Sequence, residues 1–198
     1  MKDGLEPGPS SFEIRTVAVI GAGAAGRGFA LACAAAAFDV VLEDVMPAKL
    51  RKAETEYADL RVTGRLRLAT TVEDAVREAD IAVDFVPDEL ESKLEIFSMI
   101  DRMAPPKTIL CTPSYALSIT DLASCVYRPQ RCVAVRGELV GGSVVRVLHP
   151  AEAAAETLTA VRIFLRRLGL DARCETDPDV PALMKNVVIS AILTSVRR

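Results

Sequence analysis

The sequence predicts a doubly wound α/β fold, in which helices cover both faces of a mostly parallel β-sheet. Three observations favour this fold class. Short apolar runs alternate along the chain with longer segments of helical periodicity. A glycine-rich turn joins the first apolar run to the first helical segment. The 198 residues are 51% hydrophobic and 26% charged, a globular composition that is sufficient for one sizeable core.

Strands are expected where apolar and β-branched residues form runs of five or six between polar or glycine-containing segments. These runs are Thr16–Ile20, Asp39–Glu43, Arg65–Ala69, Ile81–Val86, Thr108–Thr112, Arg131–Val135, Ser143–Leu148 and Leu170–Cys174. The third run alternates arginine with leucine, so it is expected to be more exposed than the others. Gly141-Gly142 predicts a turn between the two runs that flank it.

Helices are expected between these strands, where apolar residues recur at helical spacing. They are predicted over Ala24–Ala37, Pro47–Leu60, Val72–Ala79, Glu89–Met103, Ser118–Ser124, Pro150–Leu168 and Pro181–Val196. Pro47 suits a first helical turn, Thr71 and Ser118 are N-cap residues, and Gly169 fits the position after a last turn. Strands joined by helices of this length imply right-handed crossovers and a parallel sheet.

The first predicted strand ends in Gly21-Ala22-Gly23-Ala24-Ala25-Gly26, a GxGxxG motif that begins the first predicted helix. Gly21 allows a tight turn, Gly23 lets the backbone approach a pyrophosphate, and Gly26 lets the helix lie close to the strand. The amino terminus of the helix offers free N–H groups and a partial positive charge to phosphates. The motif therefore predicts a dinucleotide-binding site, although these residues could also form a tight turn and nothing more.

Asp44 follows the second predicted strand, 18 positions after Gly26. An acid at this place binds the hydroxyl groups of the adenine ribose of NAD, and its charge would repel the 2′-phosphate of NADP. The predicted cofactor is therefore NAD. Glu43 is a weaker candidate, because strand alternation points its side chain to the other face. The plainer interpretation of Asp44 is a helix cap.

Charge, cysteines and histidines limit the partners that the chain could have. The net charge of -3 gives no excess of basic residues for nucleic acid or an anionic membrane, and charges interrupt every apolar run before it could form a transmembrane helix. Five scattered cysteines without a signal peptide indicate reduced thiols and a cytoplasmic location. The single histidine and the lack of CxxC spacing argue against a metal site.

Most of the chain resembles the N-terminal domain of the 3-hydroxyacyl-CoA dehydrogenase family, above all its 3-hydroxybutyryl-CoA dehydrogenases. The resemblance extends from Thr16 to about Ser195, and the matching stretches are TVAVIGAGAAGRGFALACAA, DVVLEDV, TTVEDAVREADIAVDFVPDELESKLEIFSMID, APPKTIL, LSITDLA, RPQRCVAV and AVRIFLRRLGLDARCETDPDVPALMKN. The most specific feature is VPDELESK followed by LSIT at this spacing. The resemblance implies a Rossmann-type fold, NAD binding and oxidation of a hydroxyl group in fatty acid metabolism. The implied substrate is a small molecule, an acyl-CoA or a hydroxy acid.

On the cofactor side, the resemblance carries over well. The cofactor-binding residues that it implies are Gly21, Ala22, Gly23, Ala24, Ala25, Gly26, Asp44, Val86, Pro87, Asp88 and Lys93. Asp88 stands where the family has a glutamate, and Lys93 matches the family's lysine. Taken alone, these two residues would be interpreted as a helix-start acid and a solvated surface residue.

On the catalytic side, the family's residues are mostly replaced. In the family, a histidine takes the hydroxyl proton, a glutamate orients it, and a serine and an asparagine position the substrate and the nicotinamide. Arg136 stands at the histidine position, Leu148 at the glutamate position and Tyr115 at the serine position, whereas the asparagine remains as Asn186. An arginine cannot act as a general base because it stays protonated. Weak or altered activity is therefore expected.

Three interpretations of this altered site stay open. Tyr115 paired with Arg136 could be an acid–base group in a reorganised dehydrogenase, with Ser114 taking the serine's role and His149 as a weaker candidate base. The chain could instead bind NAD(H) without hydride transfer, as a sensor or a partner subunit. It could also belong to an ordinary dehydrogenase whose helical domain is a separate chain. The missing base counts against the first and the third interpretation.

The expected organisation is a disordered lead over residues 1–15, an NAD-binding domain over residues 16–180, and a C-terminal helix over residues 181–198. The resemblance makes that helix the first helix of a missing helical dimerisation domain. Its apolar stripe predicts a homodimer, and the stripe consists of Leu183, Val187, Val188, Ile192, Leu193 and Val196. The segment between the second and third strands is shorter than the family's coenzyme A-binding helical pair. It leaves Lys49, Arg51 and Lys52 as phosphate-binding candidates, or more plainly as a solvated helix face.

Overall fold

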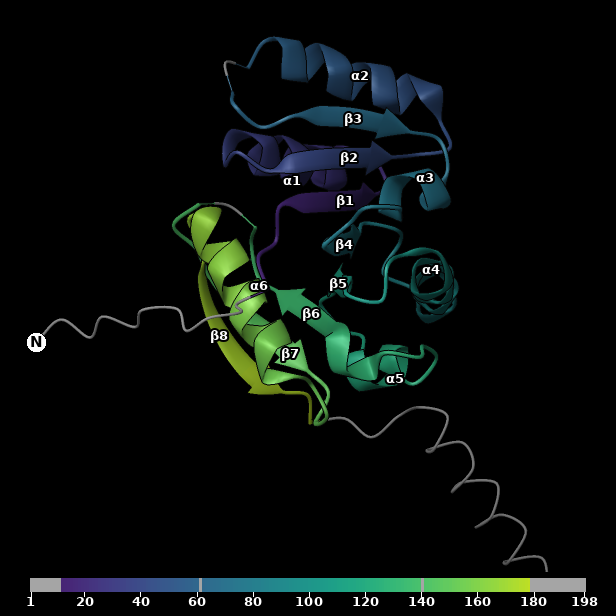
Figure 1. Cartoon of the computed structure of the whole chain (residues 1–198), viewed down its shortest axis with the longest axis vertical. Coiled ribbons are helices and arrows are strands. Elements are labelled where there is room, and N and C mark those ends of the chain that lie inside the picture. The colour runs from purple at the N-terminus through teal and green to yellow at the C-terminus, as the bar shows by residue number, and fades with distance from the viewer. Residues whose placement is uncertain (1–11, 61, 140, 179–198) are drawn as a thin grey trace, which may run out of the picture.

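Figure 1 shows the computed structural model of the chain, which describes residues 12–60, 62–139 and 141–178. Most of the expected lead lies outside these ranges. So do the predicted last helix, its apolar stripe and Asn186. Within the described ranges, the strands form a single sheet with helices on both faces. The prediction of a doubly wound, mostly parallel sheet is confirmed.

The sheet has eight strands. They are β1 (Thr16–Ile20), β2 (Asp39–Glu43), β3 (Leu66–Ala69), β4 (Ile81–Asp84), β5 (Ile109–Pro113), β6 (Cys132–Arg136), β7 (Val144–His149) and β8 (Asp171–Thr176). Their order is β3-β2-β1-β4-β5-β6-β7-β8, and β1 to β6 run parallel, whereas β7 is antiparallel to β6 and parallel to β8. The strand order reverses between β1 and β4. Ligands of open α/β sheets bind at such a switch point, beyond the carboxyl ends of the strands.

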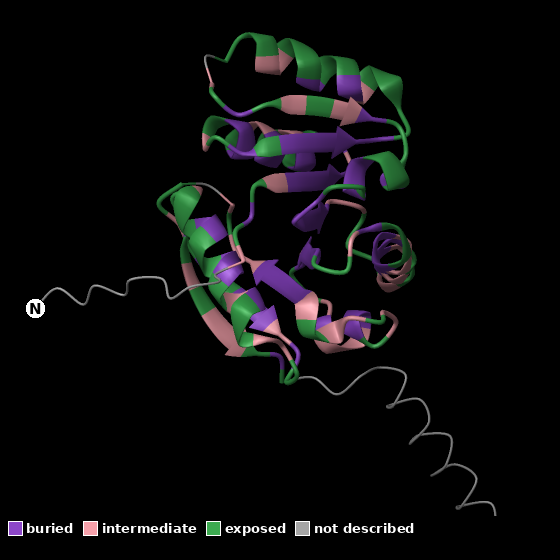
Figure 2. Cartoon of the chain, in the orientation of Figure 1, coloured by how far each residue is buried: buried purple, intermediate pink, exposed green. Residues whose placement is uncertain are grey.

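Two apolar clusters lie on the two faces of the sheet. The helices are α1 (Ala24–Ala35), α2 (Pro47–Ala58), α3 (Val72–Val76), α4 (Leu90–Met103), α5 (Ile119–Ala123) and α6 (Ala155–Arg167), with a 3₁₀ turn η1 over Pro129–Arg131. One cluster packs α1, α2 and α6 on the sheet, and the other packs α3, α4 and α5. Figure 2 shows the buried central strands between these helices, whose outer faces are exposed.

The predicted capping residues are confirmed. Thr71 Oγ1 accepts a hydrogen bond from the Asp74 N–H, and Ser118 Oγ accepts one from the Asp121 N–H. Gly169, after α6, has a φ of +76°, in the left-handed region that favours glycine. Most boundaries agree to within a few residues. The largest difference is α6, which was predicted to begin at Pro150 and begins five residues later.

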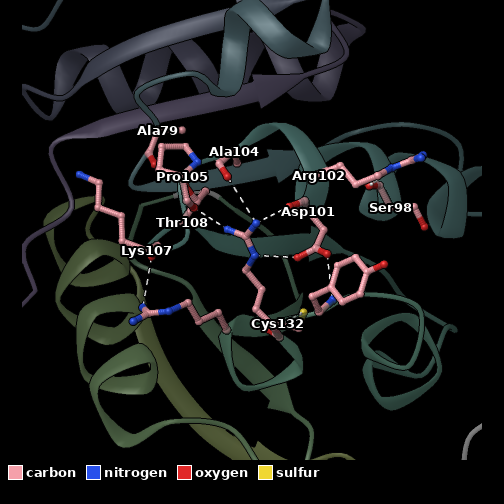
Figure 3. A network of polar contacts seen from close by, with 12 residues as sticks. Ala79, Ser98, Asp101, Arg102, Ala104, Pro105, Lys107, Thr108 and Cys132 are labelled. Carbon is pink, nitrogen blue, oxygen red and sulfur yellow. Dashed lines mark hydrogen bonds and ion pairs between the residues drawn. The ribbon is translucent and has the colours of Figure 1, made fainter.

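Arg128, whose side chain is 13% exposed, fixes the end of α4 at the amino edge of the sheet. Figure 3 shows the acceptor residues Asp101, Ala104 and Pro105 of this network. The Arg128 Nε donates to Asp101 Oδ1 at 2.6 Å, and its two Nη groups donate to the carbonyl oxygens of Asp101, Ala104 and Pro105. The last carbonyls of a helix lack partners within the helix, so the guanidinium acts as their cap. This network lies at the opposite edge of the sheet from the predicted site, and its role is structural.

All five cysteines lie in the described part of the chain, and each is a free thiol. Burial raises the pKa of the Cys33, Cys111 and Cys132 thiols well above the ordinary value. Such thiols are poor nucleophiles, so these three are core residues. Within the described residues, no helix combines the length and the apolar character that a membrane span requires.

Candidate functional site

The chain passes from β1 into α1 through the glycine motif, and the structure confirms why glycine is needed there. Gly21 has a φ of +99°, and its N–H donates to the carbonyl oxygen of Glu43 at 2.8 Å. A Cβ on Gly26 would lie 2.0 Å from the Gly21 carbonyl oxygen. The helix can therefore begin this close to the strand only with glycine at position 26. A Cβ on Gly23 would meet no atom within 4 Å, so the backbone there is open to approach.

The amino terminus of α1 carries no side-chain cap. Its N-cap residue is Gly23, and its first turn holds no acidic residue. The helices α3 and α5 are capped by the hydroxyl side chains of their N-cap residues, whereas α2, α4 and α6, like α1, have no side-chain cap. The free N–H groups of α1 and the positive end of its dipole therefore face the open side of the glycine turn. This arrangement fits the pyrophosphate of a dinucleotide.

Asp44 lies at the end of β2, next to the glycine turn. Its carboxylate accepts hydrogen bonds from the N–H groups of Ala22 and Met46, each at 2.9 Å, and from Lys49 Nζ at 3.0 Å. Burial alone would raise the pKa of Asp44, but these hydrogen bonds outweigh it and hold the pKa below its ordinary value. Burial and the charge of Asp44 raise the pKa of Glu43 instead. Asp44 is thus the better ionised of the two acids.

Lys49 does not lie on the solvated face of α2 that the plainer interpretation predicts for it. Its ion pair with Asp44 turns it towards the glycine turn, whereas Arg51 and Lys52 are exposed, as the plainer interpretation predicts. The three residues therefore do not form one cationic patch for coenzyme A.

The loop after β4 forms the next part of the site. Val86 is partly buried, and Pro87 and Asp88 are exposed. Asp88 Oδ2 accepts a hydrogen bond from the Tyr115 N–H at 3.1 Å, which ties this loop to the loop after β5. Both loops follow parallel strands, so they meet at the same edge of the sheet as the glycine turn.

Lys93 lies below this loop and is only 1% exposed. Its Nζ donates to Asp84 Oδ1 and to Thr112 Oγ1, each at 2.8 Å. Burial raises the pKa of Asp84, and the ion pair with Lys93 opposes that shift. The solvated position that was the plainer interpretation of Lys93 is therefore wrong. The structure places this side chain under the site, where it supports the ends of β4 and β5.

A pocket of about 640 Å³ lies between α1 and the hairpin that joins β6 to β7. Its walls also include the loops after β4 and β5. The residues that line it are Ala24, Ala25, Gly28, Phe29, Ala32, Phe85, Val86, Asp88, Pro113, Tyr115, Val135, Gly137, Leu139 and Gly141. Among these described lining residues, Asp88 and Tyr115 carry the polar side chains. The pocket is therefore mainly apolar and adjoins the amino end of α1.

The predicted catalytic positions are only partly brought together. Tyr115 lines the pocket and is 73% exposed. Arg136 does not line it: the guanidinium donates to the Leu117 carbonyl oxygen at 2.8 Å, and Nε is buried without a partner among the described atoms. Leu148 is buried in the apolar cluster beside α5. Within the described residues, no hydrogen bond or cation–π contact joins the side chains of Tyr115 and Arg136, so their pairing stays a prediction.

The other two candidates lie outside the pocket lining. Ser114 is buried, and its Oγ accepts a hydrogen bond from the Leu117 N–H at 3.0 Å. His149 ends β7, and its Nδ1 lies 2.9 Å from the Pro150 carbonyl oxygen. Neither side chain is placed at the pocket wall.

Sequence reasoning missed the apolar wall of the pocket. Phe29 and Phe85 pack there with ring centroids 5.3 Å apart. Ala25, Phe29 and Ala32 recur at helical spacing, a signal that could have revealed this face of α1. Leu139, on the hairpin, gave no comparable signal.

The glycine turn, the uncapped helix and the acid after β2 together define a dinucleotide-binding domain of the Rossmann type. Residues 16–136 match the sequence profile described as "3-hydroxyacyl-CoA dehydrogenase, NAD binding domain". The chain therefore belongs to the 3-hydroxyacyl-CoA dehydrogenase family, and its cofactor is NAD.

Several known proteins are similar to this chain. A probable 3-hydroxybutyryl-CoA dehydrogenase of Bacillus subtilis is 29% identical over 197 residues, covering 89% of this chain and 67% of the relative. The 5-formyl-3-hydroxy-2-methylpyridine 4-carboxylate 5-dehydrogenase of Mesorhizobium japonicum is 28% identical over 195 residues, covering 91% and 63%. The solved 3-hydroxyacyl-CoA dehydrogenase of Archaeoglobus fulgidus has a TM-score of 0.71 at 26% identity, covering 93% and 64%. The chain thus spans about two thirds of the length of these relatives.

Proposed function

We propose that residues 16–180 are the cofactor-binding domain of an NAD-dependent dehydrogenase that oxidises the hydroxyl group of a small molecule slowly. The family favours a 3-hydroxyacyl-CoA as the substrate. The observation that carries the proposal is the pocket of about 640 Å³, because it joins the dinucleotide site to an apolar space of substrate size.

Each part of the site would have a distinct role in binding and catalysis. The glycine turn and the amino end of α1 bind the pyrophosphate, and Asp44 accepts hydrogen bonds from the adenine ribose. Asp88 and its loop support the nicotinamide end. NAD, when bound, supplies the hydride acceptor. The apolar wall around Phe29 and Leu139 holds the substrate and excludes water.

The weak step is removal of the hydroxyl proton. Arg136 cannot accept a proton, Leu148 cannot orient a base, and His149 lies outside the pocket lining. Tyr115 is the lining residue that remains as a candidate to exchange this proton. Asn186, which the resemblance assigns to substrate positioning, lies outside the described residues.

An ordinary enzyme has a kcat of about 1–10³ s⁻¹. Because the general base is replaced, we expect the kcat for 3-hydroxybutyryl-CoA to be about 10² to 10⁴ times lower than that of a relative with the base. NADH formation with short 3-hydroxyacyl-CoAs measures this. Tyr115→Phe should reduce the residual rate further. Tyr127→Phe is the matched control, because Tyr127 is 91% exposed and does not line the pocket. A kcat within the ordinary range would contradict the proposal.

A second candidate function is NAD(H) binding without hydride transfer, as a sensor or a partner subunit. Two observations favour this second function: Arg136 donates a hydrogen bond to the Leu117 carbonyl oxygen, and Leu148 is buried in the apolar cluster. Neither position therefore keeps a group that could accept or donate the substrate proton. Tight NADH binding, together with no turnover of 3-hydroxyacyl-CoAs or hydroxy acids, would support this candidate.

We also propose that the chain forms a homodimer in the cytoplasm through the predicted apolar helix over residues 181–196. Burying its six aliphatic side chains would gain roughly 1.5–3 kcal/mol for each one fully covered. Light scattering should therefore give the mass of a dimer, and Ile192→Glu should shift it to that of a monomer. A wild-type monomer at high micromolar concentration, with the variant unchanged in mass, would contradict the dimer.

A further inference from the structure

The adenosine end of the site holds a cation that NAD binding itself does not require. Lys49, in the first turn of α2, places its Nζ 3.0 Å from Asp44 Oδ2. Its side chain is 42% exposed, whereas that of Asp44 is 6% exposed. The Lys49 side chain is therefore accessible from solvent while its ammonium group pairs with the nearly buried Asp44.

Of the other cations on α1 and α2, Arg27 is already paired. Arg27 Nε donates to Glu56 Oε2 at 2.7 Å, which links α1 to α2. Arg51 and Lys52 are exposed, and within the described residues neither forms an ion pair. Lys49 is thus the cation that faces Asp44 and is exposed enough to turn towards a ligand.

A lone carboxylate at this position selects NAD because it accepts hydrogen bonds from the ribose hydroxyls and repels a 2′-phosphate. Lys49 weakens the second effect, because its positive charge offsets that of Asp44. An ammonium group is also a good phosphate ligand, since charge-assisted hydrogen bonds to phosphate oxygens are strong. The same residue therefore removes a repulsion and offers an attraction.

We propose that Lys49 determines the cofactor selectivity of this site and allows NADP(H) to bind as a second ligand, more weakly than NAD(H). With NAD(H), Lys49 stays near Asp44, whose carboxylate accepts three hydrogen bonds within the protein and keeps about one further acceptor position for a ribose hydroxyl. With NADP(H), the Lys49 side chain turns to the 2′-phosphate. This inference rests on the dinucleotide site and does not depend on turnover.

Titration of the whole chain with NADH and with NADPH, followed by nucleotide fluorescence, tests the proposal. In Lys49→Met, the affinity for NADPH should fall by at least about tenfold, the size of one lost charge-assisted contact, while that for NADH changes by less than about threefold. Lys49→Arg keeps the charge and should keep NADPH binding. Lys52→Met, on an exposed position of the same helix, is the matched control and should leave both affinities unchanged.

Two results would overturn the proposal. NADPH affinity that is unchanged in Lys49→Met would show that Lys49 does not contact the phosphate. Equal losses of affinity for NADH and NADPH in Lys49→Met would show that Lys49 only holds Asp44 in place. Failure of the wild-type chain to bind NADH would overturn this proposal together with the cofactor assignment, whereas absent turnover with normal NADH binding would affect only the proposed function.

Discussion

Lys93→Met is expected to lower the free energy of unfolding by about 3–5 kcal/mol, the usual cost of removing one partner of a buried ion pair. Lys93 Nζ lies 2.8 Å from Asp84 Oδ1, and the two side chains are 1% and 0% exposed. Methionine can fill the space of the lysine stem, but it leaves the Asp84 carboxylate buried without a counter-charge. The hydroxyl of Thr112 also loses the donor Lys93 Nζ and keeps its contact with the Pro113 carbonyl oxygen.

The size of this loss should depend on pH. Burial already raises the pKa of Asp84, and removal of Lys93 takes away the group that opposes the shift. A carboxyl whose pKa is higher in the folded state binds its proton more tightly there. The destabilisation should therefore be small below about pH 4, grow as the pH rises above the unfolded value of about 3.9, and be complete above the raised pKa.

Urea unfolding at several pH values measures both effects. The double variant Lys93→Met/Asp84→Asn removes the unpaired charge and should recover most of the loss at neutral pH. Lys52→Met carries the same substitution at an exposed position and should stay within about 0.5 kcal/mol of the wild type. A loss below about 1 kcal/mol for Lys93→Met would show that Asp84 finds another partner.

Gly26→Ala is expected to lower NADH affinity by at least about tenfold and stability by about 1–3 kcal/mol. The new Cβ would lie 2.0 Å from the Gly21 carbonyl oxygen and 3.1 Å from Phe85 Cβ. The first neighbour is a backbone atom of the turn itself, so the turn must move. That movement displaces the backbone that would contact the pyrophosphate.

Gly28→Ala is the matched stability control, two residues further along α1. A Cβ there would meet no atom within 4 Å. Replacing a glycine within a helix by alanine should then stabilise the chain by about 0.5–1 kcal/mol. Thermal unfolding distinguishes the two variants, and NADH titration of Gly26→Ala measures the loss of affinity. A Gly26→Ala chain with unchanged stability and NADH affinity would contradict the steric argument.

The sequence predicted the glycine turn well because its requirements are local. The positive φ of Gly21 and the close approach at Gly26 follow from a motif of six residues. The start of α6 was wrong because it depends on a distant contact: the Ala154 N–H donates to the Gln130 carbonyl oxygen, while residues 150–153 form a turn. Helical periodicity contains no information about such a contact.

The positions of the charged side chains could not be predicted from spacing alone. Lys49 and Lys93 both belong to helices with many exposed charges, and the same pattern would fit a solvated face. The positions of their ammonium groups depend on which strand ends lie beside them, and β-strand partners are set by the topology of the whole sheet. The different positions of Tyr115 and Arg136 could not be predicted either: both lie at the carboxyl ends of neighbouring strands, β5 and β6, but the Arg136 guanidinium donates to the Leu117 carbonyl oxygen, whereas Tyr115 lines the pocket.

The uncapped amino terminus of α1 links folding of the chain to its ligand. Where Thr71 and Ser118 complete their own helices, α1 has no such residue, and bound phosphate oxygens would accept from the N–H groups that Gly23 cannot satisfy. The dinucleotide then serves as the missing cap of the helix. A ligand that binds only the folded state adds stability in proportion to the logarithm of its concentration. The stability of this chain against unfolding should therefore depend on the concentration of its cofactor in the cell as well as on its own contacts.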